Sequence, residues 1–199
     1  MMLDSKERRN AVEDHPFVKR DLLAWVGTLL AFPLAGLAAR GVAGPVDSVA
    51  AAAFAGPIAG VVIGAAQWLA LRRSGADVRW IAATAIGLAV GLGLAFAVFG
   101  YGDTVGDLAV VGAVSGLGIG IAQAWLLRDL VHGSSLAWVW VPATAAFWAL
   151  GWTVTTAIGV DPDDRWAVPG LSGAATLTVL LSAVLWVLTR SGSRARTSA

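Results

Sequence analysis

Small residues recur in this chain at a spacing of four, and the pattern appears twice. Residues 56–73 read GPIAGVVIGAAQWLALRR, and residues 112–128 read GAVSGLGIGIAQAWLLR. On an α-helix, with about 3.6 residues per turn, positions four apart lie along one narrow stripe. The two stripes are Gly56, Gly60, Gly64 and Gln67, and Gly112, Gly116, Gly120 and Gln123. Because a stripe without side chains lets another backbone come close, this pattern is typical of helices that associate inside a bilayer.

The composition is that of an integral membrane protein. Hydrophobic residues make up 57% of the 199 and charged residues 14%, whereas soluble domains average about 45–50% and 25%. Six segments reach the roughly 20 residues that a bilayer crossing needs, so we predict an all-α fold with six transmembrane helices. They are 22–39, 49–71, 80–99, 108–127, 135–159 and 167–189. Pro33 and Pro57 are expected to bend the first two, because proline removes a backbone hydrogen bond.

Basic residues gather in alternate loops. Arginine or lysine occurs in the N-terminal tail, at 72–79, at 128 and after 189, whereas the other loops are rich in aspartate. By the positive-inside rule both termini are cytoplasmic. We therefore predict cytoplasmic tails at 1–21 and 191–199 around one transmembrane domain at 22–190. Abundant alanine, glycine, valine and arginine indicate a bacterial chain, located in the bacterial plasma membrane.

The repeat extends over the whole predicted transmembrane domain. A tryptophan followed by glycine eleven residues later occurs near the start of each odd-numbered span, at Trp25, Trp80 and Trp140. The last span keeps the four-residue spacing of small residues, with Ala174, Thr178 and Ser182. Leu185 stands there where the other copies have glutamine. These matches predict three repeated helical hairpins, 22–73, 80–128 and 135–190. As parallel repeats they would have approximate threefold pseudosymmetry about an axis along the membrane normal.

The stripes and glutamines each have two interpretations. The small residues are expected to pack helices closely, and the alternative is that they leave room for a narrow water path. Gln67 and Gln123 each lie five residues before an arginine, close to the predicted cytoplasmic boundary. We expect each amide to bond across to another helix. The alternative is a polar mouth that gates a path or contacts a substrate.

Tryptophans mark the predicted cytoplasmic boundary. Seven are interpreted as interface anchors: Trp25, Trp68, Trp80, Trp125, Trp138, Trp140 and Trp186. Trp148 and Trp152 differ, because they lie one turn apart in the middle of the fifth span. They are expected to face lipid or to fill the bundle, and stacking on a ligand is the alternative.

No pattern in the sequence indicates catalysis, a cofactor or a metal. Cysteine is absent, and the only histidines are His15 and His132. The predicted spans contain no acidic or basic residue, which disfavours proton-coupled transport. The acidic turn at 161–164 is interpreted as solvated rather than as a divalent-cation site. Hydroxyls within the spans are expected to bond the backbone carbonyl one turn back; they include Ser115, Thr144, Thr153, Thr155, Thr156, Thr176, Thr178 and Ser182.

The motif Gly-xxx-Gly-xx-Gln-Trp-Leu-Ala-Leu-Arg-Arg at 60–73, echoed at 116–128, resembles a class of uncharacterised small multi-pass bacterial membrane proteins. In that class AQWLxLRR-type helix ends repeat along the chain. The resemblance covers most of the predicted membrane region and implies a fold, but no activity, substrate or partner. The second copy departs from the motif at Ala124, and the third lacks the glutamine. Three hairpins around an axis are also similar to mitochondrial carriers, whose Pro-x-[Asp/Glu]-x-x-[Lys/Arg] signature is absent from the odd-numbered spans.

Two functions follow from these observations. The first is a non-enzymatic structural or accessory membrane component, whose partners are the lipid bilayer and either another membrane protein or a second copy of the chain. The alternative is a channel or uncoupled carrier for a small or neutral solute, motivated by the pseudosymmetry and the paired glutamines. Neither function involves a nucleic acid or a cofactor.

Overall fold

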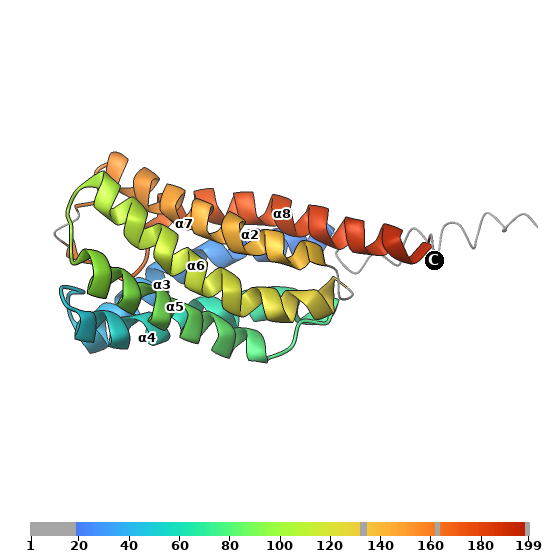
Figure 1. Ribbon diagram of the computed structural model, residues 1–199, viewed down its shortest axis with the longest axis horizontal. Coiled ribbons are helices and arrows are strands. Elements are labelled where there is room, and N and C mark those ends of the chain that lie inside the picture. The colour runs from blue at the N-terminus through green and yellow to red at the C-terminus, as the bar shows by residue number, and fades with distance from the viewer. Residues whose placement is uncertain (1–18, 132–134, 162–163, 198–199) are drawn as a thin grey trace, which may run out of the picture.

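The structure, a computed structural model, describes residues 19–131, 135–161 and 164–197. Within these ranges the regular structure is entirely helical (Figure 1). The α-helices are α2 (Lys19–Gly27), α3 (Ala31–Ala43), α4 (Val49–Leu71), α5 (Arg79–Phe99), α6 (Val105–Leu130), α7 (Trp140–Ala157) and α8 (Leu171–Thr197). Turns of 3-10 helix lie at Thr28–Leu30, Arg72–Ser74 and Ser135–Val139.

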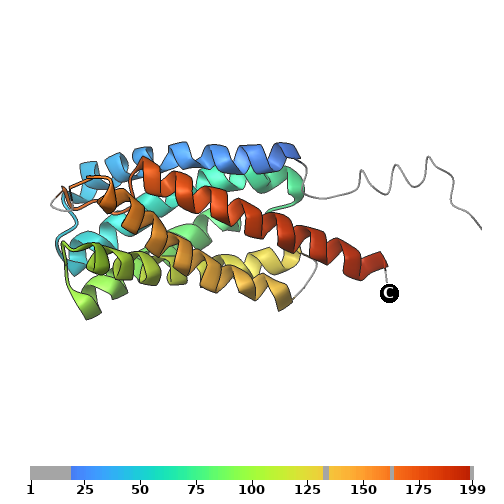
Figure 2. The ribbon, with the colours of Figure 1, turned by 90° about the horizontal axis from the view of Figure 1, so that it is seen from above.

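Consecutive helices pack side by side and form a closed ring. Each of the helices α3 to α7 packs on the next along the chain, and α8 also packs on α2 and on the turn Thr28–Leu30. Figure 2 shows α2 and α8 side by side. The end of the bundle where α2 begins and α8 ends is called the terminal end below, and the opposite end is called the distal end.

Five helical segments in the described part of the chain are long and apolar enough to cross a membrane. They are Arg20–Ala43, Val49–Ser74, Arg79–Phe99, Val105–Leu130 and Leu171–Thr189. This indicates a multi-pass membrane protein. The predicted span 135–159 is not among the five, because α7 contains four threonines and three tryptophans that lower its mean hydropathy. Helix α7 nevertheless packs between α6 and α8.

The first predicted span is interrupted one turn before Pro33. Helix α2 ends at Gly27, and α3 resumes at Ala31 after the 3-10 turn. Pro33 has no N–H to donate to the carbonyl of Leu29, which lies in that turn, so the regular α-helical ladder cannot run through it. At Pro57, by contrast, α4 runs on without interruption.

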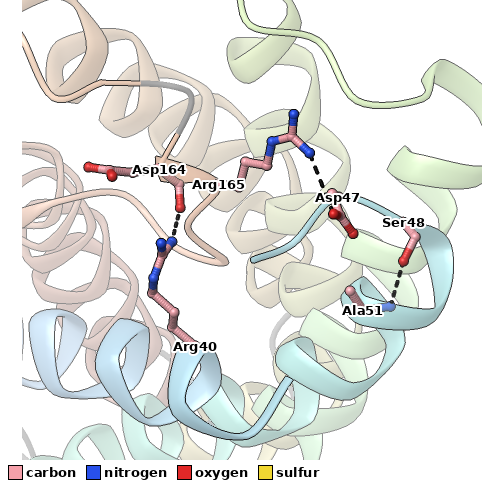
Figure 3. A network of polar contacts seen from close by, with 6 residues as sticks. All are labelled: Arg40, Asp47, Ser48, Ala51, Asp164 and Arg165. Carbon is pink, nitrogen blue, oxygen red and sulfur yellow. Dashed lines mark hydrogen bonds and ion pairs between the residues drawn. The ribbon is translucent and has the colours of Figure 1, made fainter. Parts of the chain in front are cut away.

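Polar caps fix where two helices begin. The Ser48 hydroxyl accepts a hydrogen bond from the Ala51 N–H over 3.2 Å at the start of α4 (Figure 3). At the start of α6 the Thr104 hydroxyl accepts from the Asp107 N–H over 3.1 Å, and the Asp107 carboxylate accepts from the Thr104 N–H over 3.3 Å. These bonds satisfy backbone N–H groups that have no partner within the helix.

The glycines of both stripes lie against the backbone of the following helix. A Cβ added at Gly60 would lie 2.5 Å from Ala85 Cα, and one added at Gly116 would lie 2.6 Å from the Thr144 carbonyl oxygen. The α4/α5 pairs are Gly56 with Ala89, Gly60 with Ala85 and Gly64 with Ile81, and the α6/α7 pairs are Gly112 with Ala149, Gly116 with Ala145 and Gly120 with Val141. The two interfaces therefore use positions with the same spacing. On α8, Ala174 and Thr178 are buried and Ser182 is half-buried.

At the distal end, two connections far apart in the sequence are joined (Figure 3). The Val46 N–H donates to the Arg165 carbonyl oxygen over 2.9 Å, and the Arg165 guanidinium pairs with the Asp47 carboxylate at 3.5 Å. Arg40 donates to the carbonyl oxygen of Asp164. These contacts tie the start of α4 and the end of α3 to the connection that precedes α8.

Candidate functional site: a buried glutamine and tryptophan network

The two glutamines of the stripes meet inside the bundle. The Gln123 Nε2 donates to the Gln67 Oε1 over 3.0 Å, which joins α6 to α4. Their exposed fractions are 1% and 4%. This is the cross-helix bond expected of these amides. Both amides therefore face each other in the core rather than an opening to solvent.

Each glutamine oxygen also accepts an indole N–H from the following helix. Trp80 Nε1 donates to Gln67 Oε1 over 3.0 Å, and Trp140 Nε1 donates to Gln123 Oε1 over 2.9 Å. The Gln123 Nε2 donates further to the Thr84 Oγ1 over 2.8 Å. The network thus connects α4, α5, α6 and α7. These indole donors are not among the predicted partners of the amides, although each stripe glutamine is followed by a tryptophan at the start of the next helical segment.

Three of the predicted interface anchors lie inside the bundle instead. Trp25, Trp80 and Trp140 are buried, with exposed fractions of 0%, 1% and 0%. The Trp25 ring centroid lies 6.5 Å from that of Trp80 and 5.9 Å from that of Trp140, both in edge-to-face geometry. The anchor prediction is therefore wrong for these three residues. The physical reason is that the amides of the core supply the partners that two of these indole N–H groups need.

The other four predicted anchors lie outside this core. Trp68 is half-buried, whereas Trp125, Trp138 and Trp186 are exposed. The Arg72 guanidinium lies 5.9 Å from the Trp68 ring centroid, and Arg128 lies 5.6 Å from that of Trp125. An outward-facing tryptophan with an arginine beside it is the arrangement that an interface anchor requires.

Trp25 differs from the other two central tryptophans. Its indole nitrogen is buried and has no hydrogen-bond partner among the described residues. Helix α2 packs against α8, where the fully buried Leu185 occupies the position that corresponds to Gln67 and Gln123 in the stripe pattern. A leucine offers no acceptor, so this side of the core lacks the amide found on the other two.

Most hydroxyls within the helices behave as predicted. Back-bonds to a carbonyl three or four residues earlier are made by Thr144, Thr153, Thr156, Thr176, Thr178 and Ser182. The prediction is wrong for Ser115 and Thr155, whose buried hydroxyls have no partner in the described part of the chain. Trp148 and Trp152 are both buried and fill the bundle, and the Trp148 ring lies 5.8 Å from that of Phe32.

Charged side chains lie near the ends of helices. At the start of α5, Arg79 pairs with Asp77 of the preceding connection at 3.0 Å. Two hydrogen bonds from Arg79 lower the pKa of Asp77 below its ordinary 3.8. The bond from the side chain has the larger effect, and the bond from the backbone has the smaller one. Within the described ranges, no group of three or more histidine, cysteine, aspartate or glutamate side chains is placed to hold a metal ion. His15, His132 and residues 162–163 of the acidic turn lie outside those ranges.

Comparison of the chain with protein-family models, with curated proteins and with solved structures finds no match.

Proposed function

We propose that this protein is a non-enzymatic, structural or accessory component of the bacterial plasma membrane, with a dry, packed core. The observation that carries the proposal is that Gln67 and Gln123 make their hydrogen bonds inside the bundle. The groups best suited to line a polar path are bonded to each other and to the indoles of Trp80 and Trp140. Opening a path would break these bonds, which are worth roughly 0.6–2 kcal/mol each inside a membrane.

The proposal includes six membrane-spanning helices with both termini in the cytoplasm. Helix α7 would be the sixth span. Its four threonines lower its hydropathy, but three of their hydroxyls bond back to the helix, namely those of Thr144, Thr153 and Thr156. A hydroxyl that is already bonded costs less to place in hydrocarbon than a free one. The packing of α7 between α6 and α8 supports the same assignment.

We also propose that three hairpins repeat around an axis along the membrane normal. Two interfaces support this with matching contacts, Gly60 against Ala85 and Gly116 against Ala145. Two glutamine and tryptophan pairs support it in the same way. On this interpretation the third copy has kept its tryptophan, Trp25, and lost its amide at Leu185.

The partners in this proposal are lipids and either another membrane protein or a second copy of the chain. Large apolar side chains are exposed along the helices, among them Leu30, Phe54, Val90 and Val187. Such side chains on a membrane bundle are suited to acyl chains or to the apolar surface of another membrane protein.

The channel or uncoupled carrier is the second candidate, and one observation favours it. The two amides converge at the centre, as a polar constriction would require. It predicts that replacing both Gln67 and Gln123 by leucine changes a solute flux in vesicles while the fold survives. The structural proposal predicts lower stability and no change in flux.

The deciding experiment uses the absence of cysteine from the chain. Single cysteines at Ser115 and Thr178, both buried, are treated with a membrane-impermeant thiol reagent in intact cells and in inverted vesicles. A dry core predicts protection from both sides. Cysteines at Val78 and Asp103, in exposed connections at opposite ends, serve as controls that must each react from one side. Labelling of Ser115→Cys or Thr178→Cys in folded protein would contradict the proposal.

A further inference from the structure

A small cavity lies at the distal end of the bundle, outside the glutamine and tryptophan network. Its volume is about 20 Å³, and its lining comes from α5, α6, α7 and the connection that precedes α8. Trp152 and Thr155 of α7 line it, together with Leu108 and Val111 of α6. A single water needs roughly 10–15 Å³ of such space. The cavity therefore has room for one water and not for a drug-sized ligand.

Two buried polar atoms belong to residues that line this cavity and have no partner. They are the indole nitrogen of Trp152 and the hydroxyl oxygen of Thr155, for which the described residues offer no hydrogen bond. Both residues are more than nine-tenths buried. Three residues apart on one helix, their side chains lie on the same face. An unbonded donor or hydroxyl in the interior costs about 1–3 kcal/mol, so these two groups favour an occupant of the cavity that can bond to them.

The packing of α7 explains why these groups lack a protein partner. A Cβ added at Gly112 of α6 would lie 2.6 Å from Trp152 Cδ1, the ring carbon next to the indole nitrogen. A Cβ added at Gly173 of α8 would lie 2.3 Å from the Thr155 hydroxyl oxygen. The backbone of Gly112 therefore covers the indole edge of Trp152, and that of Gly173 covers the hydroxyl of Thr155. Neither glycine brings a side-chain acceptor to these groups.

The chemistry of the lining selects a neutral molecule. An indole N–H can only donate, so it does not coordinate a cation. An anion is disfavoured because Asp161 also lines the cavity, beside a single arginine, Arg165. A hydroxyl both donates and accepts. A small neutral molecule that accepts from Trp152 and exchanges a hydrogen bond with Thr155 satisfies both groups, and water is the molecule that fits the volume.

We propose that the distal cavity is a binding site for one water molecule, held by the indole N–H of Trp152 and the hydroxyl of Thr155. The water supplies the hydrogen bond that Thr155, unlike Thr144, Thr153 and Thr156, does not make to its own helix. This site is independent of the dry core proposed above, because it lies at the other end of the bundle.

The test compares indole N–H groups within one protein. In purified full-length protein, with ¹⁵N-labelled tryptophan in a deuterated background, magnetisation transfer from water to each indole proton is measured by NMR. The resonances are assigned by single Trp→Phe variants. We expect a cross-peak between water and the Trp152 indole proton, and none for Trp80 and Trp140, whose indoles donate to glutamines. Absence of a cross-peak at Trp152 would overturn the proposal.

A second variant excludes transfer through the hydroxyl. In Thr155→Val no hydroxyl proton can relay magnetisation from bulk water, and the side chain keeps its shape. We expect the Trp152 cross-peak to persist at several-fold lower intensity, because the water has lost one of its two partners. Unchanged intensity of the Trp152 cross-peak, with the Trp80 and Trp140 resonances unshifted, would mean that the Thr155 hydroxyl does not hold the water and would also contradict the proposal.

Discussion

Gln123 makes more hydrogen bonds in the glutamine and tryptophan network than Gln67 does, although the two occupy matching positions in their stripes. It bonds to Gln67, Thr84 and Trp140. Gln67 accepts two bonds, from Trp80 and from Gln123. The network is thus asymmetric, and Gln123 is the residue through which α5 and α7 are both connected to α6.

This asymmetry predicts that Gln123→Leu is more destabilising than Gln67→Leu. Gln123→Leu removes three bonds and leaves the buried Trp140 indole N–H unpaired, at a cost of about 1–3 kcal/mol for that group alone. Gln67→Leu removes two bonds and leaves the buried Trp80 indole N–H unpaired in the same way, but Gln123 keeps its bonds to Thr84 and Trp140. Unfolding of the detergent-solubilised variants, followed by tryptophan fluorescence, gives the two free energies. An equal or greater loss for Gln67→Leu would contradict the assignment.

A substitution at Leu185 is expected to stabilise the protein rather than to destabilise it. Leu185→Gln places an amide on α8 in the position that Gln67 and Gln123 hold on α4 and α6, where it can accept the unpaired indole N–H of Trp25. We expect the free energy of unfolding to rise by about 0.6–1.7 kcal/mol, the range for hydrogen bonds between membrane helices. The measurement is the same unfolding assay.

A double-mutant cycle separates this bond from other effects of the amide. In a Trp25→Phe background the acceptor has no donor to meet, so Leu185→Gln should destabilise the protein there. Leu188→Gln, a buried position one turn further along α8, should destabilise in either background. Equal effects of Leu185→Gln with and without Trp25 would show that the two residues do not interact.

A glycine determines how closely two helices pack only where a neighbouring backbone lies against it. At Gly60 an added Cβ would meet Ala85 Cα at 2.5 Å, whereas at Gly93 of α5 nothing lies within 4 Å. Gly60→Ala must push α4 and α5 apart, and overpacking of this kind costs about 1–3 kcal/mol. Gly93→Ala is the matched control and should be neutral or stabilising by up to about 1 kcal/mol, because alanine favours the helix. Equal stability of the two variants in the unfolding assay would contradict this account.

Helix positions were largely predictable because hydropathy and length determine them. The expected segment 49–71 coincides with α4, and 80–99 differs from α5 by one residue. The direction in which a side chain points was harder to predict. A tryptophan at a helix end suits a membrane interface and a packed core equally well, so Trp25, Trp80 and Trp140 were placed outside when they lie inside. The hydrogen-bond partners of Trp80 and Trp140 depend on which helices become neighbours, and local sequence does not contain that information.

The bundle as a whole is closed differently at its two ends. Near the terminal end, side chains close it, through the amides and indoles of the core. At the distal end the connections do so, through the Val46 N–H and the pair of Arg165 with Asp47. Arg165 is the one non-glycine residue with positive φ in the described ranges, at 55°. Such a conformation costs of order 1–3 kcal/mol and persists where surrounding contacts hold it, and the contacts of Arg165 with Val46 and Asp47 do so here.

The orientation of α8 in the membrane depends on how many times the whole chain crosses it. If α7 crosses the membrane, the turn before it and the connection after it lie on opposite sides, and if α7 does not cross, they lie on the same side. Ser135 and Asp164 are exposed residues in these two segments, and the chain has no cysteine of its own. We predict that Ser135→Cys reacts with an impermeant thiol reagent only in inverted vesicles and that Asp164→Cys reacts only in intact cells. The unbroken packing of α7 against α6 supports this outcome. Reaction of both cysteines from one side would reduce the count to five and would reverse the orientation of α8 relative to α6.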